Sequence, residues 1–134
     1  MEYQRTVRME DVDITGSIFF ARLHTMALEA LEWALMQLGM PVKELLSAGQ
    51  GLPIVSSQAD FFHPIALNDQ LMIDVQCESI GQSSVKFKFK FYCDQLKASA
   101  SLTCVLIDRT SEKSIPIKGS FRALCERLQP VEAL

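Results

Sequence analysis

Hydrophobic and polar residues alternate most strictly near the middle of the chain. From Val85 to Phe91, valine or phenylalanine stands at every second position with lysine in between. Because successive side chains of a strand point to opposite faces, this segment is predicted to be a strand with one buried and one wet face. Short turn-like sequences rich in Asn, Asp, Gly and Gln separate four strand-like runs: 52–62, 71–80, 84–93 and 97–108. Such short connections favour an antiparallel meander.

A different periodicity runs from Ile18 to Leu38, where we expect one long helix that ends at Gly39 and Pro41. Its polar side chains recur at spacings of three and four, so they form one narrow stripe. The stripe consists of Arg22, Thr25, Glu29 and Glu32 and ends in Met36. The remaining positions are mostly apolar, so neighbouring structure must cover the helix on several sides. His24 lies off the stripe, and we expect it to be hydrogen-bonded in the core or in an interface.

The other segments are shorter. Residues 3–8 predict a first strand, 9–17 a loop, 114–117 an edge strand and 121–128 a terminal helix. The order is then β-α-β-β-β-β. We expect an α+β fold, in which a curved antiparallel sheet wraps a long central helix, formed by a single domain over residues 1–134.

Composition adds expectations about partners. Hydrophobic residues make up 49% of the chain, and the mean hydropathy is +0.15, so we expect a second subunit to cover part of the apolar surface. The chain has 13 basic and 16 acidic residues, which gives a net charge of −3. This charge does not attract a phosphate backbone over a long range, which disfavours a nucleic-acid partner.

Location and metal content are also constrained. The N-terminus has no apolar segment typical of a signal peptide, and charged residues interrupt the longest apolar stretch, so no membrane association is expected. The cysteines lack the close spacing of a zinc site and are expected to be reduced: Cys77, Cys93, Cys104 and Cys125. We expect a cytosolic protein without a metal or cofactor.

Residues 11–17 (sequence DVDITGS) stand directly before the predicted helix. Unpaired N–H groups at a helix N-terminus can stabilise a carbonyl oxygen as it becomes an oxyanion. A nearby carboxylate, from Asp11 or Asp13, could attack the acyl carbon or activate water. Gly16 would let the loop turn tightly. The alternative is that one of these aspartates simply caps the helix.

Residues 11–22, DVDITGSIFFAR, resemble the D-x-D-x-x-G signature of hotdog-fold acyl-CoA thioesterases of the 4-hydroxybenzoyl-CoA thioesterase type. Residues 51–61 resemble the second strand of the same family, and the likeness extends over nearly the whole chain. The resemblance implies a hotdog fold and hydrolysis of an acyl-CoA to a carboxylic acid and free CoA.

The resemblance also implies roles for individual residues. Asp13 would be the catalytic carboxylate, as nucleophile or general base, and the Phe20 backbone N–H would polarise the thioester carbonyl. Gly16 would shape the loop, and Asp11 would support it or help to position water. The family works as dimers or tetramers with sites at subunit interfaces. The acyl pocket would then be lined by residues of the partner subunit: Leu52, Pro53 and Ile54.

The chain departs from the family at three points, one of which is that the family's typical tyrosine a few residues after position 20 is Leu23 here. Some relatives that hydrolyse short-chain or carrier-linked acyl groups have histidine where this chain has Phe20, which argues against that branch. The basic turn that binds CoA phosphates in the 4-hydroxybenzoyl-CoA enzyme is Gly81-Gln82-Ser83 here. The lysines of the alternating strand could replace it, or they could simply form a solvated strand face: Lys86, Lys88 and Lys90.

Within the family, the segments 18–23, 52–55 and 59–62 are most similar to the 1,4-dihydroxy-2-naphthoyl-CoA hydrolases of the phylloquinone and menaquinone pathway. This similarity implies a bulky aromatic acyl group. A rival hypothesis is a non-catalytic hotdog module that binds an acyl group or thioester, or that serves as a subunit of a larger assembly. The missing basic turn favours the rival, and the intact D-x-D-x-x-G loop favours the enzyme.

Overall fold

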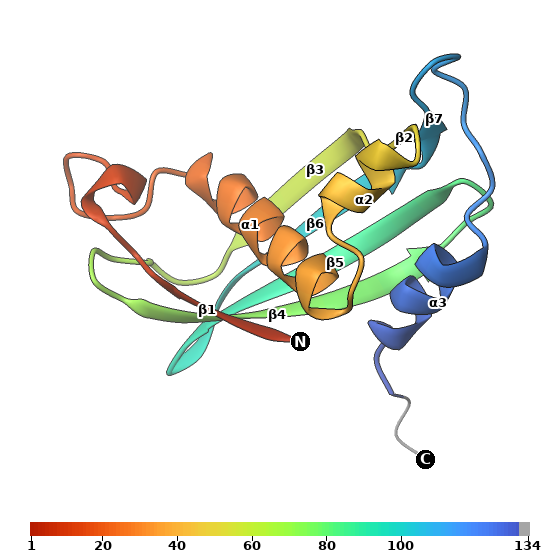
Figure 1. The fold of residues 1–134 in the computed structure, drawn as a ribbon. Helices are drawn as coiled ribbons and strands as arrows, with labels where there is room; N and C mark the ends of the chain where they lie inside the picture. The colour runs from red at the N-terminus through yellow and green to blue at the C-terminus, as the bar shows by residue number, and fades with distance from the viewer. Residues whose placement is uncertain (132–134) are drawn as a thin grey trace.

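The computed structural model describes residues 1–131 of the 134-residue chain. Helix α1 (Arg22–Gln37) lies against one face of a five-stranded antiparallel sheet (Figure 1). The spatial order of the strands is β1-β4-β5-β6-β3. Their bounds are β1 Glu2–Thr6, β3 Ile54–Phe61, β4 Gln70–Ile80, β5 Ser84–Cys93 and β6 Gln95–Val105. The predicted α+β arrangement of a helix on an antiparallel sheet is confirmed.

Several short elements complete the fold. They are the 3-10 helix η1 Met9–Asp11, the helices α2 Val42–Ser47 and α3 Gly119–Arg127, and the paired strands β2 Gln50–Gly51 and β7 Ile107–Asp108. In Figure 1, α2, α3 and the β2–β7 pair lie at the opposite end of α1 from the loop that follows β1. Among residues 1–131, no helix has the length and apolar content needed to cross a membrane.

Strand β5 supplies the centre of the core. Phe87, Phe89 and Phe91 are fully buried, whereas the lysines between them lie on the other, partly exposed face. The predicted alternation of β5 is therefore confirmed. The buried face of α1 belongs to the same core cluster and consists of Leu23, Met26, Ala27, Ala30, Leu31, Ala34 and Leu35.

The strand order differs from the predicted meander. Strands β4, β5 and β6 follow one another as expected, but β3 pairs with β6 and not with β4. The connection over residues 62–69 is longer than a hairpin turn and carries Ile65 into the core. Because of this crossover, β3 becomes an edge strand with one unpaired side.

The start of the predicted helix is also wrong. The helix begins at Arg22 and not at Ile18, because Ile18 forms a β-bridge with Val12 and donates its N–H to the Ile65 carbonyl at 2.8 Å. Phe19 and Phe20 form the turn between this bridge and the helix. The apolar spacing of these residues continues the helical pattern, but backbone pairing with the preceding loop takes precedence.

The remaining elements differ from the predicted ones in smaller ways. The run 52–62 becomes a strand only from Ile54, and the run 97–108 divides into β6 and β7. Residues 114–117 form no strand, only one bridge from Ser114 to Ile107. The terminal helix is α3, two residues earlier at its start than predicted. The last three residues of the predicted domain, 132–134, lie outside the described part of the chain.

Candidate functional site

The segment between β1 and α1 folds into a tight hairpin around Gly16. The Asp13 N–H donates to the Ser17 carbonyl at 2.9 Å, and the Gly16 N–H donates to the Asp13 carbonyl at 3.0 Å. Gly16 has a φ of +83° with nothing within 4 Å of the position a Cβ would take, so the backbone conformation alone demands glycine. The pattern is typical of a three-residue hairpin loop. This hairpin presents Asp13 to solvent.

Asp13 has one engaged and one available carboxylate oxygen. Its Oδ1 accepts hydrogen bonds from the Thr15 hydroxyl and, at 2.8 Å, from the Thr15 N–H. No side chain or amide within residues 1–131 hydrogen-bonds Oδ2. The Thr15 hydroxyl and then the Thr15 amide lower the pKa of Asp13 below its ordinary value. Asp13 is therefore an exposed, ionised carboxylate.

Neither aspartate caps α1, so the capping alternative is wrong for this helix. The residue at the N-cap position is Ala21, and no side-chain hydrogen bond caps the helix. Asp11 instead belongs to η1, where its Oδ2 accepts the Arg8 N–H at 2.8 Å. Asp13 uses its side chain within the hairpin.

Asp11 is fully buried at the centre of an ionic cluster. Arg5 of β1 donates to Oδ2 at 2.8 Å, and Arg22 of α1 donates to Oδ1 at 2.8 Å. Arg5 also contacts Glu29 at 2.8 Å. Burial alone would raise the pKa of Asp11, but the hydrogen bonds from Arg5, the Arg8 amide and Arg22 outweigh it and hold the pKa at about 2. The cluster ties the hairpin to β1 and to the first residue of α1.

The Phe20 backbone N–H lies just before α1. The Phe19 N–H donates to the Asp11 carbonyl at 2.8 Å, and the Arg22 N–H donates to the Phe19 carbonyl at 2.9 Å. Within residues 1–131 the Phe20 N–H has no acceptor. The amide is thus available at the positive end of the α1 dipole. Asp13 and Phe20 come from the two ends of the same short segment.

Aromatic side chains line a cavity beside the hairpin. The cavity has a volume of about 340 Å³ and is lined by Ser17, Ile18 and residues 61–65. Phe61 and Phe62 in its wall are 43% and 52% exposed, and the Phe20 side chain nearby in sequence is 64% exposed. Large apolar groups exposed together are typical of a ligand-binding or subunit contact.

Leu52 and Ile54 line a different cavity, of about 280 Å³, with Leu28, Leu31 and Leu35 of α1. Pro53 is exposed and does not line it. This cavity shares no lining residue with the one beside the hairpin. Within one chain, Leu52 and Ile54 therefore line a cavity separate from the one beside Asp13's hairpin.

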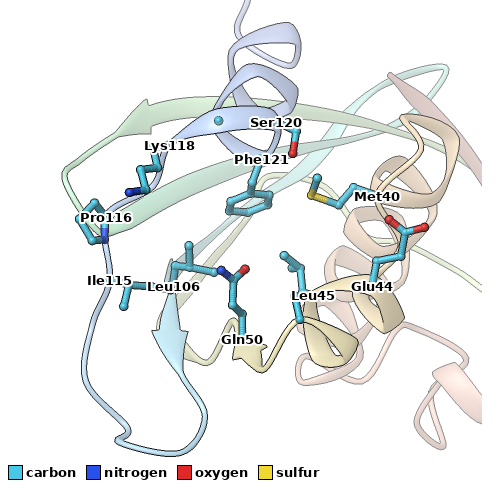
Figure 2. A pocket seen from close by; sticks show the side chains of 12 residues that line it. Met40, Glu44, Leu45, Gln50, Leu106, Ile115, Pro116, Lys118, Ser120 and Phe121 are labelled. Atoms are coloured by element: carbon cyan, nitrogen blue, oxygen red, sulfur yellow. The ribbon is translucent and has the colours of Figure 1, made fainter.

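A larger cavity of about 650 Å³ lies between α2 and α3 and contains none of the predicted site residues. The side chains of Met40, Leu45 and Phe121 point towards its centre (Figure 2). The helices that border it, α2 and α3, lie at the opposite end of α1 from the hairpin (Figure 1). It is therefore separate from the site around Asp13 in this chain.

The three lysines of β5 lie on the outer face of the sheet, opposite the face that α1 covers. Lys86 forms an ion pair with Glu78 at 3.2 Å. Lys88 and Lys90 form none within the described residues. The structure does not bring these lysines together with Asp13 on one face.

Sequence reasoning missed the residues that hold the hairpin. Thr15, Arg5 and Arg22 supply the hydrogen bonds to the two aspartates. Arg22 was recognised only as a member of the polar stripe, although a charged residue directly after a D-x-D loop was an available signal. The predicted hydrogen bonding of His24 is confirmed: its Nδ1 pairs with Ser57 Oγ. No group of three His, Cys, Asp or Glu side chains suited to a metal occurs within residues 1–131.

Comparison with known proteins shows which family the sequence resembles. The sequence pattern of the Thioesterase-like superfamily matches residues 7–125. A 1,4-dihydroxy-2-naphthoyl-CoA hydrolase from Microcystis aeruginosa is 30% identical over 124 residues, which cover 91% of this chain and 90% of that protein. A protein of the same name from Crocosphaera subtropica is 26% identical over 113 residues, 81% of this chain and 82% of its own length.

Solved structures show the same fold. The 1,4-dihydroxy-2-naphthoyl-CoA thioesterase Slr0204 from Synechocystis superimposes with a TM-score of 0.87 at 24% identity, over 95% of this chain and 96% of that one. A gentisyl-coenzyme A thioesterase superimposes with a TM-score of 0.82 at 25% identity, over 92% and 98% of the two chains. The predicted hotdog fold is confirmed by this likeness.

Proposed function

Because the chain belongs to the thioesterase-like superfamily, we propose that it hydrolyses an aromatic acyl-CoA to a carboxylic acid and free CoA. The observation that carries the proposal is the hairpin itself, where an ionised Asp13 with a free oxygen and the unpaired Phe20 N–H lie on one short segment. The relatives named for 1,4-dihydroxy-2-naphthoyl-CoA and gentisyl-CoA support an aromatic acyl group.

The Phe20 amide acts on the thioester carbonyl. Its N–H has no competing acceptor within the described residues, so it donates to the carbonyl oxygen of the bound thioester. Negative charge develops on this oxygen in the tetrahedral transition state, and a fixed donor at the start of a helix stabilises that charge. No reorganisation of the backbone is needed.

Asp13 attacks the acyl carbon or activates water. As a nucleophile, its carboxylate forms an acyl–aspartyl anhydride while the C–S bond breaks and CoA leaves as the thiolate; water then cleaves the anhydride. As a general base, it takes one proton from water while the hydroxyl adds to the carbon, and the thiolate leaves. Both routes require the ionised carboxylate that Thr15 favours. Asp11 and Gly16 act indirectly, by fixing the shape of the hairpin.

A second copy of the chain completes the site. The outer side of β3 is unpaired, and Ile54, Val55 and Phe61 along it are 41%, 62% and 43% exposed. An exposed apolar edge favours pairing with another strand. In a twofold antiparallel pairing the two strands run in opposite directions, so Ile54 of the partner subunit comes beside Phe61.

This pairing resolves the separation between Asp13 and the predicted acyl pocket. The Leu52–Ile54 segment of the partner subunit covers the aromatic cavity beside the hairpin and lines the acyl site with Pro53 at the rim. The assembly is a homodimer, or a homotetramer built from two such dimers. The same contact covers the apolar surface that the composition predicts.

The CoA nucleotide is bound by lysines on the outer face of the sheet. Lys88 and Lys90 have no ion-pair partner within residues 1–131, whereas Glu78 engages Lys86. Because all four cysteines are free thiols and disulfides are rare in the cytosol, we place the enzyme there.

A thiol-release assay with a panel of acyl-CoAs tests the function. The panel contains 1,4-dihydroxy-2-naphthoyl-CoA, 4-hydroxybenzoyl-CoA and a saturated straight-chain acyl-CoA. We expect release of CoA with the highest kcat/KM on an aromatic ester. Binding of these ligands without release would overturn the proposal and favour a non-catalytic acyl-binding module, which the absent basic turn already favours.

A further inference from the structure

His24 and Ser57 form a polar pair inside an apolar strip of surface. His24 lies on α1, and its Nδ1 hydrogen-bonds Ser57 Oγ on β3. Leu28 stands four residues after His24 on α1, so these two side chains share one side of the helix, and Phe20 stands in the turn that leads into α1. Phe20 and Leu28 are 64% and 45% exposed. In the single chain the pair is thus exposed, beside the edge of β3 that the proposed dimer would pair.

The pair offers one donor and one acceptor to a ligand whichever tautomer His24 adopts. If the Ser57 hydroxyl donates to Nδ1, then Nε2–H remains a donor and Ser57 Oγ keeps a lone pair. If Nδ1–H donates to Ser57 Oγ, then Nε2 becomes the acceptor and the serine hydroxyl the donor. A phenolic hydroxyl both donates and accepts one hydrogen bond, so it matches the pair in either state.

His24 lies close to the proposed oxyanion donor along the chain. It is the third residue of α1, and Phe20 stands two residues before the helix begins. The pair is therefore placed on the helical turn that follows the amide proposed to bind the thioester carbonyl.

On the premise of the proposed function, we propose that His24 and Ser57 recognise a hydroxyl group on the aromatic acyl ring. The enzyme then selects hydroxyaryl thioesters over aryl thioesters of the same size. An unsubstituted ring would cover the pair without satisfying its outward donor and acceptor. A buried polar group left unpaired lowers kcat/KM by about tenfold to a hundredfold.

The alternative to selective binding is a purely structural role, in which the hydrogen bond between His24 and Ser57 only holds α1 against β3. A purely structural hydrogen bond would affect all substrates equally, because it would act on folding or on the geometry of the whole site. Selective binding changes the ratio between two substrates that differ only in the hydroxyl. The test is therefore a ratio and not a single rate.

The experiment compares 4-hydroxybenzoyl-CoA with benzoyl-CoA, and 1,4-dihydroxy-2-naphthoyl-CoA with 2-naphthoyl-CoA, by thiol release. We expect kcat/KM to favour the hydroxylated member of at least one pair by about tenfold or more. Ser57→Ala and His24→Gln should each reduce that ratio towards one. The matched control is Ser56→Ala, because Ser56 is also exposed on β3 but pairs with Thr103 on the outer side of the sheet.

The outcomes separate this inference from the function on which it rests. If the wild-type protein hydrolyses both members of each pair with equal kcat/KM, the function stands and the inference is wrong. The inference is also wrong if Ser57→Ala and His24→Gln lower kcat/KM for the two substrates of a pair by the same factor. It is equally wrong if Ser56→Ala changes the ratio of the two kcat/KM values as much as these variants do. If no ester is hydrolysed, the proposed function fails and the inference falls with it.

Discussion

Two aspartates only two residues apart have opposite environments in this hairpin. Asp11 is fully buried and held by two arginines, whereas Asp13 is exposed and its carboxylate is hydrogen-bonded by the nearby Thr15. The sequence motif singles out both carboxylates. It cannot assign their environments, because Arg5 approaches Asp11 from β1 and Arg22 from α1, and this meeting depends on the tertiary fold.

Asp11→Asn should destabilise the protein more than any change at the exposed end of the hairpin. The variant leaves the guanidinium groups of Arg5 and Arg22 without their buried partner, at a cost of about 3 kcal/mol in the free energy of unfolding. Urea unfolding at neutral pH measures this loss. Asp108→Asn is the matched control, since Asp108 is also hydrogen-bonded by nearby amides but is partly exposed and unpaired with a base; its effect should be much smaller.

The same carboxylate predicts a pH dependence. The pKa of Asp11 is about 2 in the folded protein and about 3.9 in an unfolded chain. Its stabilisation is therefore complete above about pH 4 and disappears as the pH falls through about 2. Wild-type protein should lose stability over this window more steeply than Asp11→Asn. Parallel unfolding curves for the two proteins between pH 4 and 2 would contradict the assigned role of Asp11.

At the scale of elements, the local sequence pattern predicted a helix or strand correctly where its bounds did not depend on which distant segment it pairs with. The alternation of β5 is strict enough to give its bounds as predicted, 84–93. The apolar residues before Arg22 fit a helix equally well, yet Ile18 pairs with Val12 and Ile65. Strand β3 pairs with β6, which lies far from it in the sequence. The hydrophobic periodicity of β3 does not indicate which strand it pairs with.

The exposed edge of β3 predicts how the chain assembles. Val55→Lys places a charge on that edge and should convert the proposed dimer to monomers, because a lysine would be desolvated in the paired strands. Size-exclusion chromatography with light scattering measures the mass. The thiol-release rate should fall together with the mass, since the proposed acyl site includes residues of the partner subunit.

Gln82→Lys is the control for this assembly test, because it adds the same charge in the exposed turn between β4 and β5. It should leave the mass unchanged. A Val55→Lys protein that keeps the mass of the wild-type oligomer would show that β3 is not the contact. A wild-type protein that is monomeric at all concentrations would also contradict the proposed β3 contact.

At the scale of the whole molecule, apolar surface and charge are distributed unevenly. The exposed aromatic side chains gather around the hairpin and the adjoining end of β3: Phe19, Phe20, Phe61 and Phe62. The lysines of β5 lie on the opposite, polar face of the sheet. Composition predicted the surplus of apolar surface, but only the fold could place an aromatic part of it beside the hairpin that carries Asp13.

The proposed nucleotide contact predicts a substrate-dependent effect on KM. The double variant Lys88→Gln/Lys90→Gln should raise KM for an acyl-CoA by about tenfold through loss of charge-assisted hydrogen bonds to phosphate, with kcat nearly constant. For a thioester of N-acetylcysteamine, which has no nucleotide, the double variant and the wild type should have the same KM. Lys113→Gln, in the exposed loop after β7, is the control. An unchanged KM for the acyl-CoA would leave the lysines as a solvated strand face.

The most direct test of the whole account is the turnover number of Asp13→Asn on an aromatic acyl-CoA. The amide keeps an oxygen that can accept the Thr15 hydrogen bonds, but it can act neither as a nucleophile nor as a base. We predict that kcat falls by about a hundredfold or more, with an unchanged circular dichroism spectrum. Asp94→Asn, in the exposed β5–β6 turn, should retain wild-type kcat. A folded Asp13→Asn protein with near-normal turnover would contradict the assignment of Asp13 as the reactive carboxylate.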